Sequence, residues 1–334
     1  MADLSTSYLG LKLANPLVAS ASPISKRIDN VKKLEAAGIG AVVVYSLFEE
    51  QINHEQQERD HFLTKATNMH PEALDYFPDL GHYNLEPDQY LAHLSAVKKA
   101  VGIPVIGSLN GVTRGGWTEW AHRIEQAGVD ALELNLYSIP VNTSATGAGV
   151  EAQAVDLVGD VVSKVKIPVA VKLSPYYSSL PNMVRRFGEA GAKAVVLFNR
   201  FLQPDLDPEN LAVVSTARLS DSGDLAFPLR WTAILHGKVS PEIALSGGVH
   251  TGRDLLKSLL AGAQVGQIAS EILVNGTDRV REVLRDLGDW MDENEYLSVD
   301  QLRGSMSQRK VVDSAAFERA QYMRALVSLD DRFI

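Results

Sequence analysis

Eight short runs of apolar and β-branched residues recur along the chain, and segments with helical spacing lie between them. This repetition predicts consecutive strand–helix units, in which parallel strands form a sheet covered by helices. Because eight such units fit within about 260 residues, we expect a (β/α)8 TIM barrel, whose active site lies at the carboxyl ends of its strands. The predicted strands are residues 17–21, 41–46, 105–109, 131–136, 169–173, 194–198, 243–245 and 265–268.

Three segments are longer than a plain barrel requires. Residues 47–86 and 200–226 follow the second and sixth predicted strands, and loops this long at that face usually serve as lids or substrate loops. We expect one barrel domain over residues 1–286, opened by an N-terminal hairpin. Residues 287–334 should form a C-terminal helical extension that packs on the barrel or on a partner subunit. A doubly wound open sheet has the same periodicity and remains an alternative on that ground alone.

The composition excludes several classes of function. Acidic residues outnumber basic ones by 41 to 32, a formal net charge of −9, so we expect no nucleic-acid partner. The chain has no cysteine, which excludes disulfides, thiolate metal sites and an iron–sulfur cluster held by this chain. The histidines show no metal-ligand spacing. Without a signal peptide or an apolar stretch long enough to cross a bilayer, a cytoplasmic protein with no membrane anchor is expected.

Two glycines mark a candidate anion site. Gly247 and Gly248 follow the seventh predicted strand, and Ala269 and Ser270 follow the eighth. Backbone N–H groups exposed by glycines bind anions, and barrels commonly hold a phosphate group between strands seven and eight. The pattern therefore predicts a phosphorylated ligand, although tight turns also use paired glycines without function.

Polar residues end three further strands. Lys172 ends the fifth predicted strand, where its ammonium could stabilise negative charge on a bound ring system. Asn135 and Ser138 follow the fourth strand and Asn199 the sixth, and amides at one barrel mouth can bind a polar heterocycle. The alternatives are a lysine lying along the rim and amides that cap loops. A serine base needs an activating partner, so that role for Ser138 does not follow from its residue type.

Taken in order, these motifs resemble the dihydroorotate dehydrogenase family of FMN-dependent barrels. The matching stretches span residues 9–270, and their joint order is more specific than any one of them. They are LGLKLANP at 9–16 with Ala19 and Ser20, ELNL at 133–136 with Ser138, VKLSPY at 171–176, Asn199, SGGV at 246–249, and LAGA at 260–263 with Gln267.

The resemblance implies an FMN-dependent dehydrogenase that oxidises dihydroorotate, or a related dihydropyrimidine, to orotate in pyrimidine biosynthesis. Ser138 would be the base that removes a proton from C5 as hydride leaves C6 for flavin N5, and Lys172 would contact the flavin N1/O2 region. The other implied FMN contacts are Ala19, Ser20, Ser108, Asn135, Asn199, Gly247, Gly248, Ala269 and Ser270, and the implied substrate contacts are Asn135, Asn142 and Asn199.

Three positions depart from the family pattern. Tyr45 stands where soluble members carry a lysine, and Pro78 and Pro140 stand where they carry asparagines, unless a one-residue insertion lets Asn142 take over. Each lost hydrogen bond costs about 0.5–1.5 kcal/mol. Two alternatives follow, namely a flavin oxidoreductase that acts on another enone-like substrate and a flavin-binding electron-transfer or regulatory protein. An FMN-free phosphate-binding isomerase or lyase would have no use for Lys172.

The resemblance also bears on partners. It implies a small-molecule substrate and a homodimer. The barrel begins almost at Met1, which leaves no N-terminal extension for a quinone. The expected electron acceptor is therefore fumarate or a separate protein that carries an iron–sulfur cluster and FAD.

Overall fold

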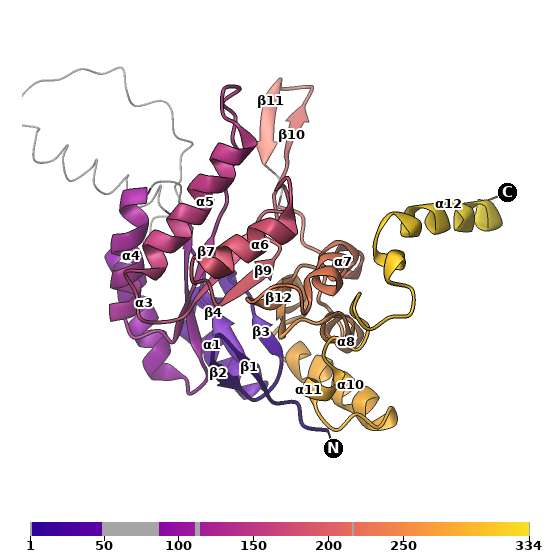
Figure 1. Cartoon of the computed structure of the whole chain (residues 1–334). Helices are drawn as coiled ribbons and strands as arrows, with labels where there is room; N and C mark the ends of the chain where they lie inside the picture. Colours follow the sequence, from indigo (N-terminus) through magenta and orange to yellow (C-terminus); the bar gives the residue numbers. More distant parts are fainter. Residues whose placement is uncertain (1, 49–86, 111–113, 216, 334) are drawn as a thin grey trace, which may run out of the picture.

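The structure, a computed structural model, describes residues 2–48, 87–110, 114–215 and 217–333. Eight parallel strands close into a barrel (Figure 1), because β4 pairs with both β3 and β6. The predicted (β/α)8 barrel is confirmed, and each predicted run overlaps one of its strands. These are β3 (Leu17–Ala19), β4 (Ala41–Val43), β6 (Val105–Asn110), β7 (Ala131–Asn135), β8 (Val169–Leu173), β9 (Ala194–Leu197), β12 (Glu242–Ser246) and β13 (Val265–Ile268).

Helices cover the outside of the barrel. Along each strand alternate side chains point outward, so Leu132 and Leu134 of β7 join the core that also holds Val158 and Val161 of α5. This outer core is made by the apolar sides of amphipathic helices. The helices are α1 (Ile28–Ala36, preceded by η1, Pro23–Lys26), α3 (Pro87–Ala100), α4 (Arg114–Gln126), α5 (Gly147–Val162), α6 (Leu180–Glu189), α7 (Ala226–Leu235), α8 (Gly252–Ala261) and α10 (Arg279–Glu293).

The barrel interior is apolar at its amino end. Small inward side chains such as Ala131, Ala170 and Ala244 form a second core with Tyr8 and Leu9. These two residues belong to the predicted N-terminal hairpin, whose strands are β1 (Thr6–Tyr8) and β2 (Leu11–Leu13). Its backbone N–H at Leu9 donates to Glu242 at the start of β12, at 2.6 Å. The hairpin therefore covers the amino end of the barrel.

Two long loops leave the carboxyl end. Residues 200–226 contain an antiparallel hairpin, β10 (Pro204–Asp207) with β11 (Ala212–Ser215), followed by η2 (Ser222–Leu225). The hairpin projects from the barrel beside α5 (Figure 1). The other loop begins with β5 (Leu47–Phe48), which extends the pairing of β6. The rest of the predicted lid, together with Pro78, lies outside the described residues.

The C-terminal part of the chain first packs on the barrel and then extends away from it. Position 286, after which we expected a domain boundary, lies inside α10. Val283 and Leu287, on the two sides of this position, are both buried. The short helices α9 (Ser270–Asn275) and α11 (Val299–Leu302) also pack on the barrel. After η3 (Ser314–Phe317), α12 (Arg319–Phe333) extends away from it (Figure 1). Three of its large apolar side chains, Tyr322, Met323 and Leu326, are exposed there.

Candidate functional site

A buried cation lies at the centre of the barrel mouth. Nζ of Lys172, on β8, lies 3.1 Å from Oγ of Ser20, 3.4 Å from Oε1 of Gln267 and 3.4 Å from Oε1 of Glu133. Gln267 in turn donates to Oε2 of Glu133 at 2.8 Å. Side-chain exposure is 8% for Lys172 and 1% for Glu133. A charge this deep needs a partner of opposite sign, so Glu133 holds the ammonium in place.

Sequence reasoning placed Lys172 and Ser20 here but gave Glu133 no role. The sequence did indicate an inward position for Glu133, because Glu133 is two residues before Asn135 on the same strand. Residues separated by two positions on a strand point to the same face. An acidic residue on the inward face of a barrel strand opposite an inward lysine predicts such a pair.

A second polar group adjoins the first. Nδ2 of Asn135 donates to Oγ of Ser108 at 2.8 Å, and Ser108 shares a 2.8 Å hydrogen bond with Ser46. Asn135 and Ser108 were predicted as flavin contacts, and the structure brings them together at the mouth. Ala19, predicted beside them, has its side chain buried in the outer core, so its backbone is the part that could contact a ligand.

The glycine turn fits a phosphate group. The backbone N–H groups of Gly247, Gly248 and Ser270 make no hydrogen bond to any residue that the structure describes. Gly247 has φ of 97°, and a Cβ built there would meet no atom within 4 Å. At Gly248 a Cβ would lie 2.2 Å from the backbone N of Leu225. Unpaired donors beside open space are the arrangement that binds an anion, so these residues suit the phosphate of FMN.

Ser138 and Asn142 differ from Lys172 in their exposure to solvent. Both are exposed in the β7–α5 loop and line a cavity of about 830 Å³. Oδ1 of Asn142 accepts the backbone N–H of Ser144 at 2.9 Å, so this oxygen is already used within its own loop. Asn199, at the end of β9, is half-buried, and its backbone N–H donates to Leu173. The predicted site residues thus include a buried group at the barrel mouth and an exposed group in the β7–α5 loop.

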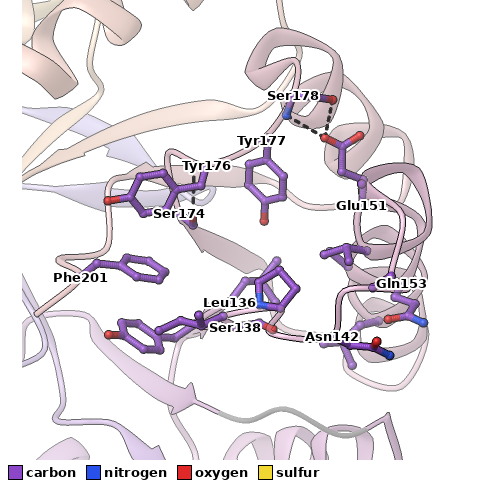
Figure 2. A pocket seen from close by; sticks show the side chains of 18 of the residues that line it. Leu136, Ser138, Asn142, Glu151, Gln153, Ser174, Tyr176, Tyr177, Ser178 and Phe201 are labelled. Atoms are coloured by element: carbon purple, nitrogen blue, oxygen red, sulfur yellow. Dashed lines mark hydrogen bonds between the residues drawn. The ribbon is translucent and has the colours of Figure 1, made fainter. Parts of the chain in front are cut away.

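Aromatic side chains form one end of this cavity (Figure 2). The Phe201 ring stacks on Tyr137 with ring centroids 4.2 Å apart and meets Tyr176 edge to face at 5.3 Å. Burial raises the pKa of Tyr177, and the nearby charge of Glu151 raises it further. Of the described residues that line the cavity, Glu151 alone is charged. These rings were not predicted as site residues, and they suit a flat ligand without negative charge.

The structure places two of the three residues that depart from the family pattern, Tyr45 and Pro140. Tyr45 packs away from the polar mouth, against Tyr90 and His93 of α3, with ring centroids 5.1 and 5.4 Å away. Its neighbour Ser46 reaches the network instead. Pro140 is exposed and lines the cavity. Nζ of Lys26, the last residue of η1, lies 5.6 Å from the centroid of the Tyr45 ring.

Two searches of the described residues gave negative results. None of the described helices is both long and apolar enough to span a membrane. Within the same residues, no cluster of three or more acidic or histidine side chains has the geometry of a metal site.

Comparison with known proteins agrees with this geometry. The family model for dihydroorotate dehydrogenase matches residues 3–291. The catalytic subunit of dihydroorotate dehydrogenase B (NAD(+)) from Thermoplasma volcanium is 27% identical over 307 residues, 91% of this chain and 98% of that protein. The corresponding subunit from Geobacter sp. is 26% identical over 316 residues, with coverage of 91% and 98%.

A third relative has a different substrate in its name. The NAD-dependent dihydropyrimidine dehydrogenase subunit PreA from Escherichia coli is 24% identical over 350 residues, 98% of this chain and 82% of that protein. The match to the family model covers the strands that carry Lys172, Glu133 and the glycine turn. The chain belongs to the dihydroorotate dehydrogenase family and is an oxidoreductase that acts on a CH–CH bond.

Proposed function

We propose that the chain binds FMN at the barrel mouth and oxidises a dihydropyrimidine, or a related ring with a CH–CH bond beside a carbonyl. The observation that carries this proposal is the buried ammonium of Lys172, held by Glu133, Gln267 and Ser20. A lysine fixed in this way holds its charge against the N1/O2 edge of a flavin ring. When bound, FMN supplies the hydride acceptor.

Each group of residues has a role in this proposal. Gly247, Gly248 and Ser270 would hold the phosphate through their unpaired N–H groups, joined by the backbone of Ala269. Ser20, Ser108, Asn135 and Asn199 would orient the flavin ring, with Ala19 contacting it through its backbone. Asn135 and Asn199 would also bind the substrate, with Asn142 contributing from the loop through its amide nitrogen. Oγ of Ser138 would take the substrate proton.

The cavity favours a neutral substrate. Among its described lining residues Glu151 carries the only charge, so a carboxylate on the substrate would gain no ion pair from them. A neutral dihydropyrimidine that packs against Tyr137, Phe201 and Tyr176 would bury no unpaired charge. We therefore rank a neutral dihydropyrimidine above dihydroorotate.

An absorption spectrum of the purified protein, followed by anaerobic titration, tests the proposal. Flavin absorbance that bleaches with dihydrouracil but not with dihydroorotate supports it fully, and bleaching with dihydroorotate alone would reverse the ranking of substrates. Ser138→Ala should abolish bleaching and keep the flavin, whereas Ser144→Ala in the same loop should change neither. A protein that cannot take up FMN would refute the proposal.

A second function is favoured by the position of Ser138. Ser138 is exposed and makes no hydrogen bond to the described residues, so nothing among them activates its hydroxyl. Such a serine is a weak base. A flavin-binding electron-transfer or regulatory protein would keep the cofactor and lack the dehydrogenase reaction. Flavin that is reduced by dithionite but by neither dihydropyrimidine would identify this function.

Assembly and cellular role are parts of the same proposal. The exposed Tyr322, Met323 and Leu326 of α12 support a homodimer, and light scattering of a Met323→Glu variant should then show a smaller mass than the wild type. The relatives named above are subunits by name, which supports a separate electron-acceptor protein. We place the reaction in pyrimidine metabolism of the cytoplasm.

A further inference from the structure

The hydroxyl of Tyr177 points into the cavity (Figure 2). Tyr177 is half-buried in the loop between β8 and α6. Its ring packs on the outer core and meets the ring of Phe187 of α6 edge to face, with centroids 6.1 Å apart. The hydroxyl makes no hydrogen bond to any residue that the structure describes. A tyrosine hydroxyl in such surroundings usually has a partner, and Tyr177 has no role in the function proposed above.

The backbone on both sides of Tyr177 is held in place. The backbone N–H of Tyr176 donates to Oγ of Ser174 at 3.0 Å. On the other side, the backbone N–H and the hydroxyl of Ser178 both donate to Oε1 of Glu151, at 2.9 and 2.7 Å. Together with the contact between the two aromatic rings, these hydrogen bonds fix the direction of the Tyr177 side chain. A donor that is fixed before a ligand arrives loses little entropy on binding.

The surroundings of the hydroxyl favour a neutral acceptor. Burial raises the pKa of Tyr177 well above the ordinary value of 10.0, and the charge of Glu151 raises it further. The hydroxyl therefore keeps its proton at neutral pH and can donate it in a hydrogen bond. The same negative charge repels an anionic acceptor. A carbonyl oxygen accepts a hydrogen bond without meeting that repulsion.

We propose that Tyr177 is a catalytic residue, and that its hydroxyl donates a hydrogen bond to the substrate carbonyl beside the carbon that loses its proton. The inference rests on the proposed function, because it takes this cavity as the substrate site. In a dihydropyrimidine this carbonyl is at C4, next to C5. Pro140, which stands where the family carries an asparagine, lines the same cavity. A proline side chain has no hydrogen-bond donor, and Tyr177 supplies one from the opposite loop.

The bonds that change in the reaction give this hydrogen bond its catalytic effect. When the C5–H bond breaks, the proton goes to the base, for which Oγ of Ser138 is proposed. The electron pair left on C5 is shared with the C4 carbonyl oxygen and forms the C5=C6 double bond. The C6–H bond breaks with its electron pair, and the hydride reduces the oxidised flavin. The carbonyl oxygen is thus more negative in the transition state than in the substrate, so a donor to it stabilises the transition state more than the substrate.

Anaerobic single-turnover kinetics test the inference. The rate of flavin bleaching is measured against the concentration of dihydrouracil, or of dihydroorotate if only that compound bleaches the wild type. Tyr177→Phe removes the hydroxyl and keeps the ring that packs on Phe187. We expect the limiting rate to fall by about tenfold and the half-saturating concentration to rise by about threefold. The effect on the rate is larger because a hydrogen bond to a charged acceptor is stronger than one to a neutral acceptor.

A matched control makes the same chemical change elsewhere. Tyr296 is also half-buried, and its ring stacks on Trp290 of α10 with centroids 5.7 Å apart. Tyr296→Phe should bleach at the rate of the wild type. Both variants should keep the FMN content and the midpoint of thermal unfolding of the wild type, which separates loss of the hydrogen bond from damage to the fold.

Two outcomes would overturn the inference and leave the proposed function intact. One is a Tyr177→Phe protein with the limiting rate of the wild type. The other is a rate that falls only together with FMN content or thermal stability, because the role of Tyr177 would then be structural. A wild-type protein whose FMN is bleached by neither dihydropyrimidine would refute the proposed function itself, and the inference with it.

Discussion

Nζ of Lys172 lies 3.4 Å from Oε1 of Glu133, and both side chains are buried beneath the barrel mouth. Two polar neighbours, Ser20 and Gln267, complete the surroundings of the ammonium. Buried ion pairs contribute little net stability, but removal of one partner leaves the other uncompensated. The pair therefore holds a buried cation in place at a cost that the rest of the fold must offset.

Removal of this cation alone should destabilise the protein. We expect Lys172→Met to lower the free energy of unfolding by about 3–5 kcal/mol, because the Glu133 carboxylate stays buried without an opposite charge. The double variant Lys172→Met/Glu133→Gln should recover most of that loss and still bind FMN weakly. Urea unfolding measures the first effect, and flavin content after gel filtration measures the second. A single variant as stable as the wild type would contradict the pairing.

The two glycines of the turn should respond differently to alanine. At Gly248 a Cβ would meet the backbone of Leu225 at 2.2 Å, whereas at Gly247 it would meet nothing within 4 Å. Both positions have positive φ, so each variant carries backbone strain of about 1–3 kcal/mol. Gly248→Ala should lose clearly more stability than Gly247→Ala in thermal unfolding. Equal losses would show that the contact with Leu225 is not rigid.

Phe201 should matter for substrate and not for flavin. Its ring lies between Tyr137 and Tyr176 in the cavity, so Phe201→Ala removes the stacking surface for a flat ligand. We expect KM for the oxidised ring to rise by about tenfold, since aromatic pairs contribute about 0.5–1.5 kcal/mol. Flavin content should stay unchanged. Leu206→Ala, on the exposed strand β10, is the control, and an unchanged KM for Phe201→Ala would exclude the cavity as substrate site.

Tyr45 should affect stability only at high pH. Burial raises its pKa to about 12 from the ordinary value of 10.0. Between these values the folded state keeps the proton and the unfolded state loses it, so the contribution of Tyr45 to stability falls as pH rises. Tyr45→Phe should remove that part of the decline, because its hydroxyl has no hydrogen-bond partner among the described residues.

Its control is Tyr322→Phe, an exposed tyrosine of α12, which should leave the pH profile of unfolding unchanged. Tyr45→Phe should also keep its flavin, since the ring packs on Tyr90 of α3. Loss of flavin from this variant would mean that Tyr45 contributes to the cofactor site after all.

The buried group at the barrel mouth could largely be predicted from the sequence. Lys172, Asn135 and Gly248 end strands, and in a barrel all strand ends meet at one mouth. The loop group could not be predicted in the same way. Phe201 and Tyr137 are more than sixty positions apart in irregular segments, where no periodicity indicates the direction of a side chain. The same holds for His250 and Ser220, whose side chains meet at 3.1 Å although they are 30 positions apart.

By itself the sequence determined the order of strands and helices, because apolar periodicity of two and of about 3.6 residues is a local property of the chain. It also determined which residues stand at strand ends, and hence the position of Lys172. Only the tertiary structure decided which partners those residues have. Closure of the barrel brings Glu133 and Gln267, which are 134 positions apart in the sequence, together beside Lys172. Long-range contacts of this kind follow from packing and not from local pattern.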